Sequence, residues 1–183
     1  IGLDSLRRDI ALDATSPLTP RLAAFREHSY IESNVVSPLA RTFPAWTTIL
    51  TGLHPSESGV RDNLVPQNQI PMQHSLAWKL KKHGYRTVYA TDETRFSNIG
   101  HEFGFDQIIA PRAGVSDYLL GQFGDQPIRN FMVQWPISEY WLPSLVGNRA
   151  FAQAYKPLRF NRRVINELGA ATQQPTFIAT HFC

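Results

Sequence analysis

Short apolar runs alternate with amphipathic segments along the chain, and this alternation predicts strands and helices in turn. Strands are predicted over residues 1–3, 30–36, 86–91, 107–110 and 176–181. Helices are predicted over residues 19–28, 42–50, 74–83, 115–123 and 158–171. Strands that alternate with helices favour a mostly parallel sheet with helices on both faces. We therefore expect a three-layer α/β/α fold.

Residues 131–151 do not fit this alternation. The segment mixes large aromatic side chains with prolines: Trp135, Pro136, Tyr140, Trp141 and Pro143. The prolines break any regular helix, so we interpret the segment as an insertion packed on the domain. A lid over a site and a membrane-facing surface are the alternatives.

The composition is that of one ordered domain. The chain has 183 residues, of which 43% are hydrophobic and 18% charged, and this length is enough for a sizeable core. The single cysteine, Cys183, excludes an internal disulfide and a zinc site built on several thiolates. The chain has no apolar run of about 18 residues and no secretory leader.

The charge is weakly basic, with a net value of +3. The densest cationic cluster is Lys79, Lys81, Lys82 and His83. On a helix this cluster is interpreted as a solvated face, so we expect no nucleic-acid partner. A modest positive field still favours the approach of an anionic substrate.

The chain begins inside one predicted strand and ends directly after another. A domain rarely begins and ends inside its central sheet, because such strands need flanking connections. We therefore expect the chain to be a piece of a longer protein, whose site is completed by other segments, and to be inactive alone.

Polar side chains follow several of the predicted strands. Asp4 comes directly after the first strand, Asp92 and Glu93 follow the strand that ends at residue 91, and His181 ends the last one. Ligands bind outside the carboxyl ends of the strands in such sheets, so we expect these groups to line one crevice. Asp4 suits a hard metal ion or a catalytic base, with a turn or helix cap as the alternative.

Thr42 is predicted at the start of a helix that has Pro44 in its first turn. Its hydroxyl would lie at the positive end of the helix dipole, beside free backbone N–H groups. This position favours an anionic substrate and stabilises a deprotonated oxygen; the alternative is an ordinary N-cap threonine. If Asp4 and Thr42 share a site, they must lie within roughly 10 Å of each other.

Four stretches carry a resemblance to a known family. They are Ile1-Gly2-Leu3-Asp4-Ser5-Leu6-Arg7-Arg8-Asp9, Thr19-Pro20-Arg21-Leu22, Thr42-Phe43-Pro44, and Thr51-Gly52-Leu53-His54-Pro55 followed by Gly59. In this order and spacing they resemble the sulfatase-type domain of the alkaline phosphatase superfamily. Beyond Val60 the resemblance thins to the alternation of strands and helices, the Asp92-Glu93 pair and the final strand.

The resemblance implies that Asp4 and Thr42 bind a divalent metal ion, which could be zinc, calcium, magnesium or manganese. It implies that Thr42 is the nucleophile and forms a covalent phospho-threonine intermediate, with Arg41 adding charge stabilisation. Asp92, Glu93 and His181, placed at strand ends, are the candidate substrate-binding residues.

Three departures from the family pattern bear on the chemistry. Sulfatases proper have a cysteine or serine for conversion to formylglycine, and an arginine two residues after the proline, where this chain has Thr42 and Trp46. Thr-Phe-Pro resembles instead the nucleophile segment of the superfamily's nucleotide pyrophosphatase/phosphodiesterases. Ser5 stands where sulfatases usually carry a second aspartate. The Asp-His-Gly segment that supplies further metal ligands in the family is absent from the chain.

The sequence thus predicts the N-terminal part of a metal-dependent hydrolase or transferase that acts on phosphate esters. The alternatives are a sulfuric ester hydrolase and a catalytically incomplete domain that binds an anion or a partner. The expected substrate is an anionic phosphate or sulfate ester. The resemblance favours a membrane-associated or extracytoplasmic location, with any membrane association made through segments outside this chain.

Overall fold

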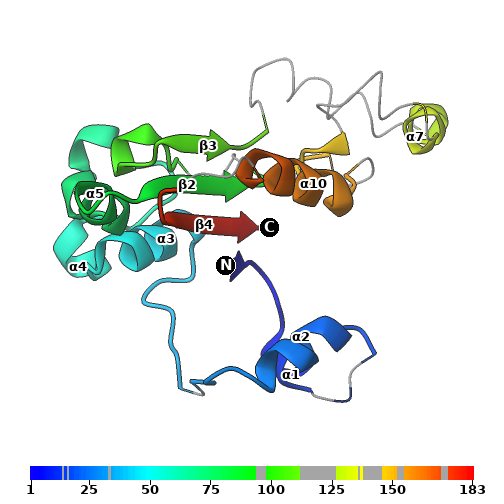
Figure 1. The fold of residues 1–183 in the computed structure, drawn as a ribbon, viewed down its shortest axis with the longest axis horizontal. Coiled ribbons are helices and arrows are strands. Elements are labelled where there is room, and N and C mark those ends of the chain that lie inside the picture. The colour runs from blue at the N-terminus through cyan, green and yellow to red at the C-terminus, as the bar shows by residue number, and fades with distance from the viewer. Residues whose placement is uncertain are drawn as a thin grey trace.

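Four parallel strands form the central sheet of the computed structural model, which describes residues 1–13, 15, 17–32, 34–93, 98–111, 127–135, 137, 146–151, 155–169 and 173–183. The strands are β1 (Gly2–Leu3), β2 (Arg86–Thr91), β3 (Gln107–Ile109) and β4 (Thr176–Phe182). Their order across the sheet is β1-β4-β2-β3 (Figure 1). All three pairings are parallel, so the carboxyl ends of the strands share one edge of the sheet.

One face of the sheet is covered by α3 (Thr42–Thr51) and α5 (Leu76–Lys82). A single core cluster joins Phe43 and Trp46 of α3 and Ala77 of α5 to Tyr89 and Ala179 of the strands. Short elements extend this layer: α4 (Pro55–Ser58), η1 (Gln67–Gln69), η2 (Met72–His74) and η3 (His101–Phe103).

The opposite face is covered by α10 (Pro157–Leu168). Its buried Phe160 packs with Val88, Ala90 and Ile109 of the sheet, in a cluster separate from the one under α3. The two clusters on opposite faces confirm the expected three-layer α/β/α fold with a parallel sheet.

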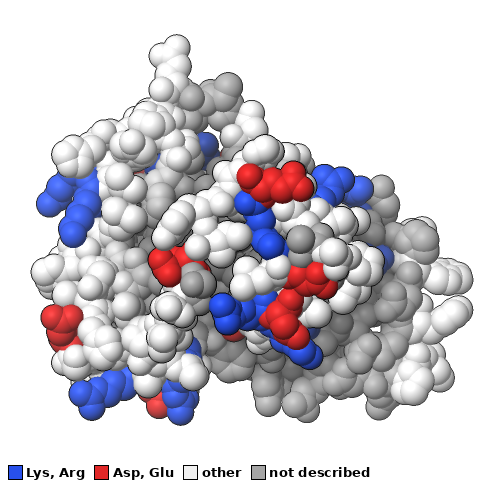
Figure 2. All heavy atoms as spheres, turned by 90° about the horizontal axis from the view of Figure 1, so that it is seen from below, with Lys and Arg blue, Asp and Glu red and all other residues white. Residues whose placement is uncertain are grey.

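Two further helices, α1 (Arg8–Leu12) and α2 (Pro20–Arg26), lie together below the sheet in Figure 1. The guanidinium of Arg26 donates to the carbonyl of Ala11 at 3.2 Å and links the pair. Figure 2 views the molecule from this side, where Lys and Arg are interspersed with Asp and Glu. The predicted absence of a nucleic-acid partner stays a prediction.

Most predicted elements are found at or close to their expected bounds. Glycine ends α3 as expected, because Gly52 takes the left-handed conformation (φ 74°) and donates its N–H to the carbonyl of Thr48. The strand predicted over residues 30–36 is wrong. Its apolar side chains are exposed, Tyr30 by 90% and Val36 by 85%, and none of its described residues pairs with a neighbouring strand. Alternation alone cannot make a strand without a partner.

The predicted helix over residues 115–123 lies outside the described residues, as does much of the segment 131–151. Within that segment, Phe131 lies in α7 (Pro127–Gln134) and is exposed, whereas Val146 and Phe151 form a small buried cluster. Its interpretation as an insertion or a lid stays a prediction. Among the described helices, none is long and apolar enough to cross a membrane.

Candidate active site

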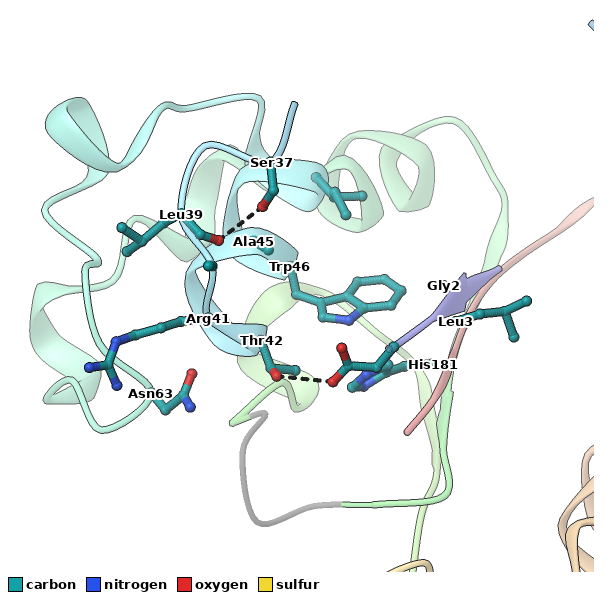
Figure 3. A pocket seen from close by; sticks show the side chains of 13 residues that line it. Gly2, Leu3, Ser37, Leu39, Arg41, Thr42, Ala45, Trp46, Asn63 and His181 are labelled. Carbon is teal, nitrogen blue, oxygen red and sulfur yellow. Dashed lines mark hydrogen bonds between the residues drawn. The ribbon is translucent and has the colours of Figure 1, made fainter. Parts of the chain in front are cut away.

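Thr42 and Asp4 come together although 38 residues separate them in the sequence. Thr42 is the first residue of α3, and Asp4 follows the last residue of β1. The Thr42 hydroxyl donates to Asp4 Oδ2 over 3.3 Å, the contact drawn as a dashed line from Thr42 in Figure 3. The two residues therefore lie well within the separation that a shared site requires.

The backbone around Asp4 is held on both sides. Its N–H donates to the carbonyl of Phe182 at 2.8 Å, which continues the pairing of β1 with β4. Ser5 then takes a left-handed conformation (φ 59°), so the chain turns away directly after the carboxylate. Asp4 is thereby fixed at the edge of the sheet with its side chain exposed.

A close approach between β1 and α3 sets the distance from Asp4 to Thr42. A Cβ on Gly2 would lie 2.5 Å from Trp46 Cζ2, so only glycine lets the indole pack this closely on the strand. The same indole contacts the imidazole of His181, with ring centroids 5.1 Å apart. Trp46, which stands where the sequence departs from the sulfatase pattern, is thus a packing residue of the site.

His181 ends up almost fully buried, with 1% of its surface exposed. Burial lowers the pKa of its imidazole and outweighs the raising effect of the charges on Asp4, Asp92 and Glu93, so the ring is neutral at neutral pH. Nε2 lies 3.5 Å from Cys183 Sγ. Nδ1 is buried and has no hydrogen-bond partner among the described residues.

One open pocket of about 750 Å³ is lined by Asp4, Thr42, Trp46 and His181 among other residues. Its polar side carries Asp4, Thr42, His181, Arg41 and Asn63. Leu3, Leu39, Trp46 and Ile49 supply an apolar wall. A pocket with charged and hydroxyl groups beside an apolar wall suits a ligand that combines an anionic group with an organic one.

A comparison with known protein families bears on this pocket. The family model described as Sulfatase matches residues 1–182. The chain belongs to the sulfatase family. Neither a curated protein nor a solved structure gives a match.

Membership of the sulfatase family makes the domain one of the hydrolases of the alkaline phosphatase superfamily, and such domains are generally metal-dependent. The match spans the described sheet and the helices on both faces, so the resemblance drawn from the first sixty residues extends over nearly the whole chain.

Several residues of this sulfatase-family site fit a divalent metal ion. One donor atom each from Asp4, His181 and Cys183 lies within 4.8 Å of the others. A carboxylate oxygen, a neutral imidazole nitrogen and a sulfur are all donors that divalent transition metals accept. The buried, unpartnered Nδ1 shows in addition that the polar groups of the imidazole are not all satisfied by the described residues. The donor set therefore fits a metal, with Asp4 as the expected ligand.

Arg41 lines the pocket, but its guanidinium is engaged elsewhere. Nη1 donates to Asp62 Oδ1 at 3.1 Å, and Figure 3 shows the side chain extending away from Thr42 and His181. The Phe43 N–H, expected to be free for an anion, donates to Asn63 Oδ1 at 3.0 Å. That part of the expectation is wrong, because a side chain of the following loop caps the start of α3.

Asp92 and Glu93 are not among the residues that line the pocket, although both follow the carboxyl end of β2. Asp92 is 1% exposed and accepts hydrogen bonds from the Tyr155 hydroxyl at 2.6 Å and from the Cys183 N–H at 2.9 Å. Glu93 is also buried, and its carbonyl accepts from the Thr91 hydroxyl. The expectation of one crevice shared by Asp4, Asp92 and His181 is therefore wrong for Asp92.

The hydrogen bond between Asp92 and Tyr155 ties the end of β2 to the segment before α10. Burial and the neighbouring Asp92 carboxylate raise the pKa of the Tyr155 hydroxyl. The Arg149 N–H donates to the carbonyl of Asp92 at 2.9 Å. Asp92 thus links β2 to Arg149 and Tyr155, and its predicted role in substrate binding, like that of Glu93, stays a prediction.

Sequence reasoning missed two contributors to the site. The first is Asn63, because no local signal relates it to Phe43, 20 residues earlier. Cys183 was noted only as a lone cysteine. Its spacing of two from His181 was the available signal, because alternate residues of an extended segment lie on the same face.

Proposed function

We propose that this sulfatase-family chain carries the nucleophile of a metal-dependent phosphoesterase or phosphotransferase, and that Thr42 is that nucleophile. The observation that carries the proposal is the contact of the Thr42 hydroxyl with Asp4, at the carboxyl edge of the sheet and inside the pocket. Ligands of open parallel sheets bind at this edge.

The geometry favours attack by the Thr42 oxygen. Because Asp4 Oδ2 accepts its hydrogen bond, the hydroxyl proton faces the carboxylate and the lone pairs of Oγ1 remain for the substrate. The position at the first residue of α3 adds the positive end of a ten-residue helix dipole, which favours negative charge on Oγ1.

The proposed step forms a bond from Thr42 Oγ1 to phosphorus and breaks the bond from phosphorus to the ester oxygen. The proton that the Thr42 hydroxyl loses balances the one that the leaving ester oxygen takes up. The phospho-threonine then passes its phosphoryl group to water in a hydrolase or to an acceptor hydroxyl in a transferase. A divalent ion held at Asp4, once bound, would lower the pKa of the hydroxyl and neutralise charge on the transferring group.

Arg41 is the proposed source of further charge stabilisation. Its ion pair with Asp62 is exposed on both sides, with 52% and 61% of the two side chains accessible. Such surface pairs are worth only about 0–1 kcal/mol. An anion in the pocket that Arg41 lines can therefore compete with Asp62 for the guanidinium.

Phosphorus is the proposed centre because threonine cannot be oxidised to the aldehyde of formylglycine. The arginine expected two residues after the proline is replaced by Trp46, whose indole is packed between Gly2 and His181. The indole is uncharged, so this position offers no cation to a sulfate ester.

The test compares Thr42→Ala and Thr42→Ser in the full-length protein, including whatever lies beyond residue 183. With an aryl phosphodiester, Thr42→Ala should lower turnover by ~10³-fold or more, equivalent to about 4 kcal/mol of barrier. Thr42→Ser should keep part of the rate because the attacking oxygen survives. Mass spectrometry of quenched wild-type protein should find the phosphoryl group on Thr42.

Thr48→Ala and Thr48→Ser are the matched controls, because Thr48 lies in the same helix but does not line the pocket. Both should keep the wild-type rate. A Thr42→Ala rate within a few-fold of wild type would make Thr42 a helix-start residue without a catalytic role. Hydrolysis of an aryl sulfate as fast as the phosphodiester would favour the sulfatase alternative, and binding of phosphate without any turnover would favour the anion-binding one.

A further inference from the structure

The pairing of β1 with β4 places three different metal-binding side chains at one point. Leu3 is opposite Phe182 in the parallel register, so the next residues along the two strands are Asp4 and Cys183. His181 lies two residues before Cys183, and its Nε2 is 3.5 Å from Sγ. Donor atoms of Asp4, His181 and Cys183 all lie within 4.8 Å of one another.

The buried imidazole supplies an independent sign that a ligand belongs here. His181 is 1% exposed, and its Nδ1 has no hydrogen-bond partner among the described residues. Nearly all buried polar atoms in folded proteins have a hydrogen-bond partner, so an orphaned one calls for an explanation. A cation bound at Nδ1 would satisfy this atom directly, whereas a cation bound at Nε2 would fix the ring proton on Nδ1.

The surrounding charges also favour a cation. The negative charges of Asp4, Asp92 and Glu93 all act electrostatically on the side chains of His181 and Cys183. Among the described groups, Arg149 places an opposing positive charge near Cys183. Burial and these carboxylates raise the pKa of the Cys183 thiol to about 12. Metals bind the thiolate form of cysteine, so metal binding at Cys183 would release the thiol proton.

We propose that Asp4, His181 and Cys183 form a three-ligand site for a zinc-class transition-metal ion, with one coordination position open toward Thr42. This proposal rests on the proposed function in one respect, because Asp4 is also the metal ligand in the proposed phosphoesterase. The open position is inferred from Thr42 Oγ1, which lies 3.3 Å from Asp4 Oδ2. Three protein ligands and one open position are typical of catalytic zinc sites.

The donor set determines the class of ion. Calcium and magnesium take oxygen ligands, whereas sulfur and imidazole nitrogen select zinc and its neighbours in the first transition row. In a tetrahedral zinc site with bonds of 2.0–2.3 Å, donor atoms are about 3.3–3.8 Å apart. The exposed side chain of Asp4 can make the shift of about 1 Å that closes the site from 4.8 Å.

The test is a titration of the metal-free, reduced full-length protein with Co²⁺, followed by competition with Zn²⁺, Ca²⁺ and Mg²⁺. Cobalt bound by a thiolate gives a near-ultraviolet charge-transfer band. Cys183 is the only cysteine of the 183-residue chain, so a chain ending there assigns the band without ambiguity. In a longer protein, loss of the band in Cys183→Ser assigns it. Zn²⁺ should abolish the band, and Ca²⁺ and Mg²⁺ should leave it.

Cys183→Ser should remove the charge-transfer band and weaken Zn²⁺ binding by at least about 10-fold, the loss that even indirect metal contacts cause. Cys183→Ala should have the same two effects. Because alanine has no donor atom, this variant shows the effect of losing the sulfur without the weak hydroxyl donor of serine. His28→Gln, which changes an exposed histidine outside the pocket, should bind Zn²⁺ like wild type. Circular dichroism checks that each variant is folded.

A saturating cobalt spectrum without the thiolate band would overturn the proposal, as would equal Zn²⁺ affinity in Cys183→Ser and wild type. Thr42→Ala separates this proposal from the proposed function. That variant should keep the thiolate band while losing turnover. A missing band with Thr42-dependent turnover rejects the zinc-class site alone, and an intact band with turnover independent of Thr42 rejects the proposed nucleophile alone.

Discussion

The sheet carries a threonine–aspartate pair at each end, and the two pairs are built in opposite ways. Thr87 and Asp106 lie at the amino ends of β2 and β3, one residue into the first and one residue before the second. Thr42 and Asp4 lie at the carboxyl edge, beside the end of β1. Because both pairs consist of a threonine and an aspartate, they allow a direct comparison of the two edges.

The amino-end pair is fully used by the fold. Thr87 is buried, and its hydroxyl lies 2.8 Å from the carbonyl of Gly104 and accepts the N–H of Asp106 at 3.1 Å. Asp106 accepts the N–H of Thr87 at 3.0 Å and pairs with Lys81. These contacts join β2, β3 and α5.

In the described part of the chain, the side chains of the carboxyl-edge pair share one hydrogen bond, at 3.3 Å, and line the pocket. The nearby His181 Nδ1 is without a partner in the described part of the chain. The comparison teaches that satisfied polar groups at one edge stabilise the sheet, while incompletely satisfied groups at the other are free to bind a ligand. This difference, and not the residue types, is what distinguishes the candidate site.

The largest expected effect is a difference in the free energy of unfolding between variants of Thr87 and variants of Thr42. Thr87→Val removes a buried hydroxyl and leaves the carbonyl of Gly104 and the N–H of Asp106 less well satisfied, so it should cost about 2–3 kcal/mol in the free energy of unfolding. Thr42→Val should cost no more than about 0.5 kcal/mol. Urea denaturation of the two variants measures both values, and similar losses would erase the distinction between the edges.

The sequence could predict which edge carries the site, but not which side chains reach it. The parallel order of strands places Asp4 and His181 at one edge, and the resemblance in the first sixty residues adds Thr42. Asp92 follows the same rule yet is buried, because its partner is Tyr155, 63 residues away. A contact made through tertiary packing leaves no trace in local periodicity.

The second prediction concerns the glycine that sets the geometry of the carboxyl edge. Gly2→Ala places a Cβ 2.5 Å from Trp46 Cζ2, so the indole or β1 must move. Such overpacking typically costs about 1–3 kcal/mol, and here it should also shift tryptophan fluorescence and weaken metal binding through Asp4.

A double-mutant cycle with Trp46→Phe provides the control for Gly2→Ala. The smaller ring leaves room for the new methyl group, so Gly2→Ala should be less destabilising in the Trp46→Phe background than in wild type. Additive effects of the two substitutions would show that the contact between Gly2 and Trp46 does not hold the two elements at their observed separation.

The smallest expected effect is a pH dependence of stability that arises at the amino-end pair. Burial raises the pKa of the Asp106 carboxyl. The hydrogen bond and charge of Lys81, together with the hydrogen bonds from Thr87, lower it by more. The pKa of Asp106 therefore lies below its ordinary value of 3.8. The unfolded state then binds more protons in the acid range. The stabilising contribution is complete above about pH 4 and is lost as the pH falls through the folded-state pKa.

Asp106→Asn should therefore lower the free energy of unfolding by about 1 kcal/mol near neutral pH, a modest loss because Lys81 and Asp106 are partly exposed. The difference from wild type should narrow as the pH falls below about 4. Lys81→Gln, which removes one cause of the lowered pKa, should show a smaller narrowing of the same sign. Urea denaturation between about pH 7 and about pH 3 measures these differences. A gap that stays constant with pH would show that Asp106 stabilises the amino edge through its shape and neutral hydrogen bonds, and not through its charge.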